Sequence, residues 1–167
     1  KSKSEFIFDN KNNKIIDKWY NWNTTTSSWD VDGKNEYAYD SNGNKILKLE
    51  YKWDTITSSW MISYKYKYGY NNNNNKILEE YYFWDTTTFS WIGYESKNEY
   101  IYDNTGNEML NIWYEWNYSS FSWELTGKYE YTYNSKENKT RSSYYWNSNT
   151  SLWELSRKTE YSFDNKG

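Results

Sequence analysis

Carboxylates are the side chains of this sequence best suited to acid–base catalysis. The chain has 167 residues, of which 23 are Asp or Glu, and it contains neither His nor Cys. A glycosidase needs two carboxyl groups about 5–10 Å apart. Glu36, Glu99, Glu130 and Glu160 recur at one position of a sequence repeat, where the third copy has Lys67. This pattern is typical of a solvated strand position, so we predict no catalytic residues and no enzymatic activity.

Cation binding is the second chemistry that the sequence suggests. Asp40, Asn42 and Asn44 supply oxygen atoms at alternate positions, as in a calcium loop. The segment is short and lacks the later bidentate Glu of such loops. Turn formation explains the same residues without a metal. We therefore expect neither a metal site nor a cofactor.

The charge distribution restricts the partners of the chain. Its formal net charge is −3, from 20 basic and 23 acidic residues, and the basic residues are interspersed rather than clustered. Such a surface has no field that would hold nucleic acid. No run approaches the roughly 18 apolar residues that a membrane span needs. We predict no nucleic-acid partner and no membrane insertion.

Aromatic rings are the candidate ligand contacts. Trp, Tyr and Phe make up 23% of the chain, and most of them are expected to form the core, because aliphatic residues are scarce. Four rings fall on the face of the predicted sheet that is otherwise polar. Exposed rings of this kind mark interaction surfaces as often as they are ordinary. The candidate ligand-binding residues are Trp19, Trp113, Tyr81 and Phe83.

A tandem repeat must position these rings. Two Trp separated by six residues occur five times, at steps of 31, 31, 32 and 30 residues. A repeat of this length is one supersecondary unit that buries its apolar face only against neighbours. The pairs are Trp22/Trp29, Trp53/Trp60, Trp84/Trp91, Trp116/Trp123 and Trp146/Trp153.

Each repeat is predicted to form two strands. The chain has no Pro, and Tyr, Trp, Thr and Ile alternate with polar residues, as in half-buried strands. We expect an all-β fold, an antiparallel up-and-down meander of about eleven strands with two alternating turns. The sheet is either curled or a single flat layer. We expect one continuous array of about five units over residues 1–167. The motifs Glu5–Asn10 and Glu160–Asn165 fall at the same position of the repeat, so we expect the chain to be a segment of a longer protein.

The two turns have different signatures. One follows an aromatic-x-aromatic motif, as in Asp40-Ser41-Asn42-Gly43-Asn44, where Gly43 can adopt a positive φ. Asn12, Asn74 and Gly106 hold the corresponding position, and Asn tolerates the same conformation. The other turn lies inside each Trp pair and would place the two rings opposite each other.

Counting outward from both turns gives one aromatic face. Trp53 opposite Trp60 places Leu49 by Tyr64 and Leu47 by Tyr66, and the other turn places Gly33 by Tyr51. A bulge near Gly93 is predicted to absorb an extra residue in the third unit, and the turn at 134–138 in the shortened fifth unit should differ in type. The opposite face would be polar, with Asp30, Asp32, Lys34, Glu36, Ile46, Lys48, Glu50 and Lys52.

Two family resemblances follow from these motifs. Tyr37-Ala38-Tyr39-Asp40-Ser41-Asn42-Gly43-Asn44 resembles the YxYDxxGN core of YD (Rhs-type) repeats, over about a quarter of each unit. The whole chain is similar to the Tyr/Trp-rich tandem repeats of Bacteroidota surface proteins. That second resemblance implies a secreted protein, located outside the cell or on its surface.

Three functions remain open at this stage. The first is adhesion by a non-enzymatic extracellular module that binds glycan or another surface polymer through aromatic contacts. The second is a structural stalk or fibre whose sheet edges self-associate. The third is a shell segment of a YD-repeat-like toxin assembly.

Overall fold

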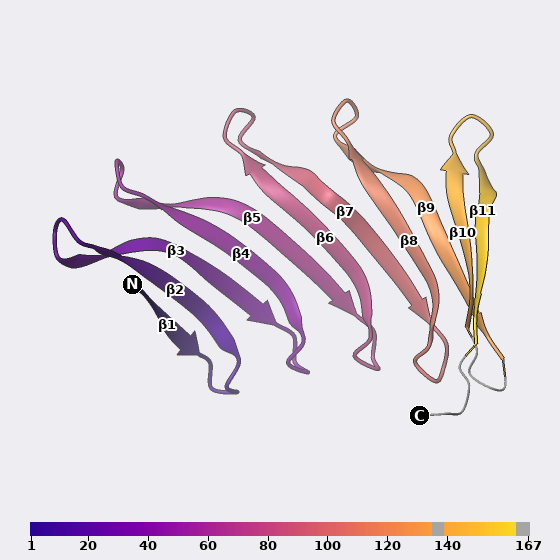
Figure 1. Ribbon diagram of the computed structural model, residues 1–167, viewed down its shortest axis with the longest axis horizontal. Coiled ribbons are helices and arrows are strands. Elements are labelled where there is room, and N and C mark those ends of the chain that lie inside the picture. Colours follow the sequence, from indigo (N-terminus) through magenta and orange to yellow (C-terminus); the bar gives the residue numbers. More distant parts are fainter. Residues whose placement is uncertain (135–138, 163–167) are drawn as a thin grey trace. The chain divides into compact units, whose positions relative to one another are not determined.

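The protein is an all-β antiparallel meander, as predicted. The computed structural model describes residues 1–134 and 139–162, which contain strands and turns but no helix. Each strand is hydrogen-bonded to its neighbours in sequence (Figure 1). The strands are β1 (Ser2–Phe8), β2 (Lys14–Asn23), β3 (Ser28–Tyr39), β4 (Lys45–Asp54), β5 (Ser59–Tyr70), β6 (Lys76–Asp85), β7 (Ser90–Tyr102), β8 (Glu108–Asn117), β9 (Ser122–Tyr133), β10 (Lys139–Asn147) and β11 (Leu152–Tyr161).

Contacts divide the chain into two compact units. Unit 1 contains residues Lys1–Gly69 and Tyr81–Tyr94, and unit 2 contains Tyr70–Glu80 and Glu95–Gly167. Unit 1 therefore includes β1 to β4, nearly all of β5, and adjoining parts of β6 and β7. Unit 2 includes β8 to β11 and the remaining parts of β6 and β7.

The turns after the aromatic-x-aromatic motifs have the predicted conformation. Gly43 and Gly106 have φ of 86° and 89°, and Asn12 and Asn74 have φ of 64° and 62°. The Asp40 carboxylate accepts hydrogen bonds from the backbone N–H groups of Asn42 (2.9 Å) and Asn44 (2.8 Å). Side-chain and backbone hydrogen bonds thus form the turn. We call the four turns that contain Asn12, Gly43, Asn74 and Gly106 the asparagine turns.

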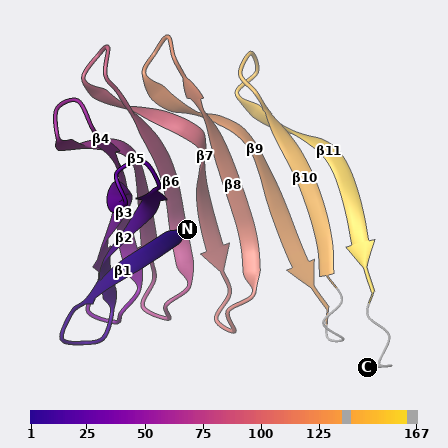
Figure 2. The same cartoon turned by 60° about the vertical axis from the view of Figure 1, so that its left-hand side comes forward.

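The other turns, which we call the tryptophan turns, also follow the prediction. Trp53 lies directly opposite Trp60, with ring centroids 5.0 Å apart in an edge-to-face arrangement. All five pairs have this geometry, at 5.0–5.2 Å. Edge-to-face rings contribute about 0.5–1.5 kcal/mol beyond burial. The two kinds of turn alternate along the chain (Figure 2). Each strand from β2 to β8 therefore has an asparagine turn at one end and a tryptophan turn at the other.

The predicted register away from the turns is wrong, because a β-bulge interrupts most hairpins. Between β4 and β5 the pairing skips Ser63, so Leu49 faces Lys65 and Leu47 faces Lys67. Between β3 and β4 it skips Ile46, so Gly33 faces Lys52 instead of Tyr51. One extra residue moves every later side chain to the other face.

The bulges mix rings and charges on both faces, which corrects the predicted polar face. Lys34, expected on that face, lies opposite Tyr51. Its Nζ is 4.4 Å from the Tyr51 ring centroid and 4.9 Å from that of Trp60. Lys34 also pairs with Glu36 at 2.5 Å. The Lys34 ammonium group thus contacts two rings. Lys3, Lys65 and Lys128 have the same arrangement.

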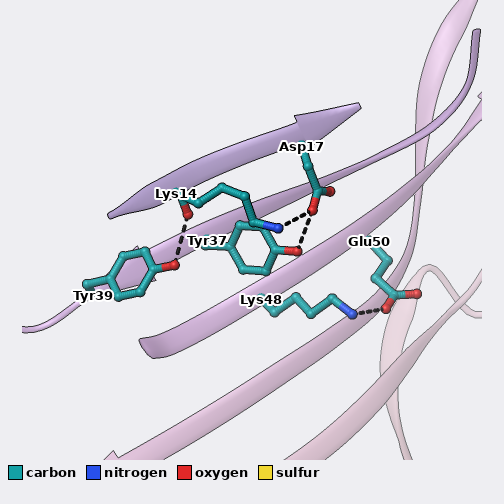
Figure 3. Close-up of polar contacts among 6 residues, drawn as sticks. All are labelled: Lys14, Asp17, Tyr37, Tyr39, Lys48 and Glu50. Carbon is teal, nitrogen blue, oxygen red and sulfur yellow. Dashed lines mark hydrogen bonds and ion pairs between the residues drawn. The ribbon is translucent and has the colours of Figure 1, made fainter. Parts of the chain in front are cut away.

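Tyr37 and Tyr39, expected on the face of the Trp pairs, lie on the opposite face, because the β2–β3 pairing skips Asp32. The hydroxyl of Tyr37 donates to Asp17 at 2.9 Å, and Lys14 contacts the same carboxylate at 2.7 Å (Figure 3). The Tyr39 hydroxyl donates to the Lys14 carbonyl at 2.9 Å. Burial would raise the pKa of Asp17, but the hydrogen bonds from Lys14 and Tyr37 outweigh it and keep this pKa below its ordinary value.

Repeat-length differences are absorbed inside strands. β7 has 13 residues where β3, β5 and β9 have 12, so the extra residue of the third unit lies within this strand. The fifth unit is one residue short, and β9 pairs with β10 in continuous register from Lys139–Tyr133 to Tyr145–Gly127. The residue that the fifth unit lacks is therefore the one that forms the bulge after the asparagine turn in other units, such as Ile46. The turn at 134–138 is predicted to differ in type, but its residues 135–138 lie outside the described residues, as do Phe163 and Asp164 of the last motif.

Neither unit has a closed core among the described residues. The buried apolar side chains there are Ile92 and Tyr131, and no large side chain is fully buried. Most rings are half-buried against neighbours on their own face. Cross-strand contacts of rings and charged pairs therefore supply much of the stability of the sheet.

Candidate functional site

Trp19 and Trp113 are half-buried and cover glycines. A Cβ atom added at Gly33 would lie 2.2 Å from Cζ2 of Trp19, and one added at Gly127 would lie 2.1 Å from Cζ2 of Trp113. The Trp19 indole N–H also donates to Asp32 at 3.1 Å. Trp113 packs on Tyr129, with ring centroids 4.6 Å apart. The structure therefore gives both rings a packing role, whereas their predicted ligand role depends on the ring faces left open.

Tyr81 and Phe83 belong to a continuous aromatic cluster in unit 1. Tyr81 packs edge-to-face on Tyr66 at 5.4 Å, and Phe83 does so on Tyr94 at 6.1 Å. Tyr64 joins the two pairs, since its centroid is 6.5 Å from Tyr66 and 5.6 Å from Tyr94. Tyr94 is 39% exposed, so the cluster is open to solvent.

A hollow of about 450 Å³ lies beside this cluster, and we call it the Phe83 hollow. Its lining combines apolar and polar groups from three strands and a turn, so it has the composition of a ligand site. Met61, at its edge, is 48% exposed. The lining includes Lys52, Trp60, Met61, Ser63, Tyr64, Phe83, Trp84 and Thr86.

The bulge at Ser63 shapes the Phe83 hollow. Because the β4–β5 pairing skips this residue, Tyr64 faces Glu50, whereas uninterrupted alternation would place it opposite Leu49. Bulges re-aim side chains in this way and are common beside binding sites. Tyr64 and Tyr66 thereby lie on the same face as Lys52 and Met61. The Tyr66 ring is 4.8 Å from the Nζ of Lys48.

The charged groups around the Phe83 hollow are mostly engaged. Glu50 is paired with Lys48 at 2.5 Å (Figure 3). The Asp54 carboxylate accepts hydrogen bonds from the hydroxyl of Thr57 and the backbone N–H of Ile56, which lower its pKa. Asp85 is held in the same way by its own tryptophan turn, and its pKa is lowered too. Lys52 is exposed and has no hydrogen bond or ion pair with any described residue.

Unit 2 has an equivalent hollow of different composition. Its volume is about 700 Å³, and we call it the Glu115 hollow. Glu115 occupies the repeat position of Lys52, and Glu124 occupies that of Met61. The two carboxylates lie directly opposite each other across β8 and β9. The position of Phe83 is held by Tyr145, whose hydroxyl donates to Glu154.

Glu115 and Glu124 do not have the desolvated surroundings that are typical of the catalytic acid of a glycosidase. Glu115 and Glu124 are both exposed, and Glu124 accepts a hydrogen bond from Asn117 at 2.7 Å. A catalytic acid needs a carboxyl group whose proton is retained by a desolvating environment. In the described ranges, no three Asp or Glu residues gather in a way that could hold a metal ion. The same ranges contain no helix long and apolar enough to cross a bilayer.

Sequence reasoning found part of the Phe83 hollow. It singled out Phe83, which lines the hollow, and Tyr81, which supports it through Tyr66. It missed Lys52, Met61 and Tyr64. The available signal was departure from the repeat, because the position of Lys52 holds Asn21, Phe83, Glu115 and Tyr145 in the other units.

Comparison with known proteins identifies the fold. No protein-family model matches the chain, and no curated protein matches it. A solved Bacteroides fragilis protein of unknown function has a TM-score of 0.59 and 18% identity, over 77% of this chain and 90% of that one. The two proteins share a fold. This likeness concerns the fold alone.

Two DUF3836 family proteins are more distant in structure. The one from Parabacteroides distasonis has a TM-score of 0.46 and 19% identity, over 55% of this chain and 81% of that one. The one from Bacteroides vulgatus has a TM-score of 0.31 and 18% identity, over 77% of this chain and 98% of that one.

Proposed function

We propose that this chain is a non-enzymatic, extracellular or cell-surface repeat module that binds glycan through the Phe83 hollow. The observation that carries the proposal is the open aromatic cluster beside a hollow with a mixed polar and apolar lining. Flat rings pack against the apolar faces of sugars, while hydroxyl and charged groups bind sugar oxygens. Neither a cofactor nor nucleic acid has a part in this activity.

Binding at one hollow is expected to be weak. The Phe83 hollow is shallow and open, and Tyr94 at its side remains 39% exposed. Polymers with repeated sugars can compensate, because several molecules or repeats acting together raise the overall affinity without any new contact. Adhesion to a polysaccharide surface therefore suits this site better than capture of a single free sugar.

The test is a screen of the protein on a broad glycan and polysaccharide array, followed by titration with Trp fluorescence. For a glycan that binds, Phe83→Ala should weaken binding about tenfold, equivalent to roughly 1.4 kcal/mol. Phe89→Ala is the matched control. This residue is 76% exposed in a tryptophan turn and does not line the hollow, so its loss should leave affinity unchanged.

Two results would count against the proposal. One is the absence of any glycan ligand for protein whose circular dichroism spectrum shows a folded sheet. The other is a ligand whose affinity is equally reduced by Phe89→Ala and Phe83→Ala.

A structural role is the second candidate, and one observation favours it. β1 pairs with β2, and on this edge strand Phe6, Ile7 and Phe8 are 54%, 47% and 52% exposed. Exposed apolar edge strands are templates for association with another chain. The chain would then act as a stalk or fibre component whose partner is a second copy.

A further inference from the structure

The least satisfied charge near the candidate site is the ammonium group of Lys52. Several lysines at other repeat positions are paired with carboxylates, as Lys48 is with Glu50 and Lys34 with Glu36. Lys52 lines the Phe83 hollow and is exposed. It has no hydrogen bond or ion pair with any described residue. An unpaired cation at the wall of an aromatic hollow is suited to an anionic group of a ligand.

We infer that the Phe83 hollow selects an acidic saccharide, whose carboxylate is bound by Lys52 while a sugar ring packs on Phe83 and Tyr64. The inference rests on the proposed function, since it names the class of glycan for the same hollow. One cation recognises one carboxylate per sugar. The interaction therefore differs from the broad positive field that nucleic acid requires.

Comparison of the two hollows supports this selectivity. The Glu115 hollow has a carboxylate where the Phe83 hollow has Lys52, and another, Glu124, where the Phe83 hollow has Met61. An acidic sugar would meet repulsion in the Glu115 hollow and attraction in the Phe83 hollow. The sequence repeat thus supplies two similar sites with opposite charge, of which one suits the proposed ligand.

Because the other charged groups around the Phe83 hollow are paired or negative, the attraction of an acidic sugar depends on Lys52. Asp54 and Asp85 lie in the adjoining turns, and Glu50 is neutralised by Lys48. The two turn carboxylates oppose an anion, although their oxygens are occupied by turn hydrogen bonds. The attraction of an acidic sugar consequently depends on one side chain, and removing that side chain should remove the preference.

The experiment compares matched glycans and matched variants. The probes are polygalacturonate, alginate and hyaluronan, each beside its carboxyl-reduced neutral form, titrated at low salt. We expect at least one acidic polymer to bind about tenfold more tightly than its neutral form. Lys52→Met should abolish this difference, and Lys52→Glu, which reproduces the charge of the Glu115 hollow, should reverse it.

Lys11→Glu is the control for net charge, because Lys11 is exposed in an asparagine turn of the same unit. It should leave the acidic preference intact. If acidic and neutral forms bind equally, or if Lys52→Met leaves the preference unchanged, the inference is overturned while glycan binding stands. If none of the six polymers binds, the inference is overturned; if the broad array is also negative, the proposed function fails with it.

Discussion

At the scale of single residues, the closest fit in the structure is between two indole rings and two glycines. Trp19 lies over Gly33 and Trp113 over Gly127, at distances where no Cβ atom could be accommodated. The pairing of a large ring with a glycine fills the sheet surface at a weak strand position. The sequence pattern predicts Tyr51 opposite Gly33, but Tyr51 faces Lys34 and lies on the other face of the sheet.

Gly33→Ala should destabilise the protein by about 1–3 kcal/mol, because the Trp19 ring must move to admit the new methyl group. Urea unfolding followed by fluorescence would measure this loss. The same substitution in a Trp19→Leu background should cost much less, since the smaller side chain leaves room. Equal losses in both backgrounds would show that the ring is not the cause.

Stability at low pH should depend on the turn carboxylates. Hydrogen bonds from Thr105 and Asn107 lower the pKa of Asp103 from 3.8 to about 2. A depressed pKa in the folded state means that this stabilisation is complete above about pH 4 and is lost as pH falls through about 2. Asn71 plays the same part in its own turn without a charge, accepting from the N–H groups of Asn73 and Asn75.

Asp103→Asn should therefore preserve the turn and weaken the pH dependence. We expect the melting temperature of the variant to fall less steeply between pH 4 and pH 2 than that of the unchanged protein. Above pH 5 the two curves should run parallel. Parallel curves over the whole range would contradict the assigned role of the Asp103 carboxylate.

At the scale of strands and turns, sequence analysis succeeded where local chemistry decides the structure. The left-handed positions at Gly43 and Asn74, and the facing rings of Trp53 and Trp60, follow from turn residues and short-range pairing. Strand number and order follow from the repeat. These features need only the identity of residues close together in sequence.

The faces could not be predicted, because counting from a turn assumes strict alternation. Ile46 and Ser63 carry no signature of a bulge, yet each moves the rest of its strand to the other face. The continuous β9–β10 register, where the repeat is one residue short, shows that the bulge is part of the repeat length itself. Lys52 lies on the predicted face, but the bulge at Ser63 brings Tyr64 to that face, so its aromatic neighbour could not be predicted.

The opposition of Glu115 and Glu124 should weaken the β8–β9 pair. Like charges directly opposite each other are destabilising, so Glu115→Gln should stabilise the protein by about 0.5 kcal/mol. Urea unfolding at low ionic strength would measure the gain. Because salt screens exposed charges, the gain should shrink in about 0.5 M NaCl. A gain independent of salt would point to a cause other than charge.

At the scale of the whole molecule, the exposed β1 edge and the Phe83 hollow predict different behaviour. If β1 mediates association, light scattering should show oligomers that grow with protein concentration. Ile7→Lys should suppress them by placing a charge on the edge strand, without changing glycan binding. A strict monomer at high concentration would leave adhesion through the hollow as the better supported role.

Indole resonances offer the most direct test of glycan binding at the Phe83 hollow. The chain has 12 Trp, and two-dimensional NMR resolves their indole N–H groups individually. With the best ligand from the array, the signals of Trp60 and Trp84, two residues that line the hollow, should shift in proportion to occupancy. Those of Trp19 and Trp113 should stay in place. Shifts confined to Trp19 and Trp113, or no shift at saturating ligand, would contradict glycan binding at the Phe83 hollow.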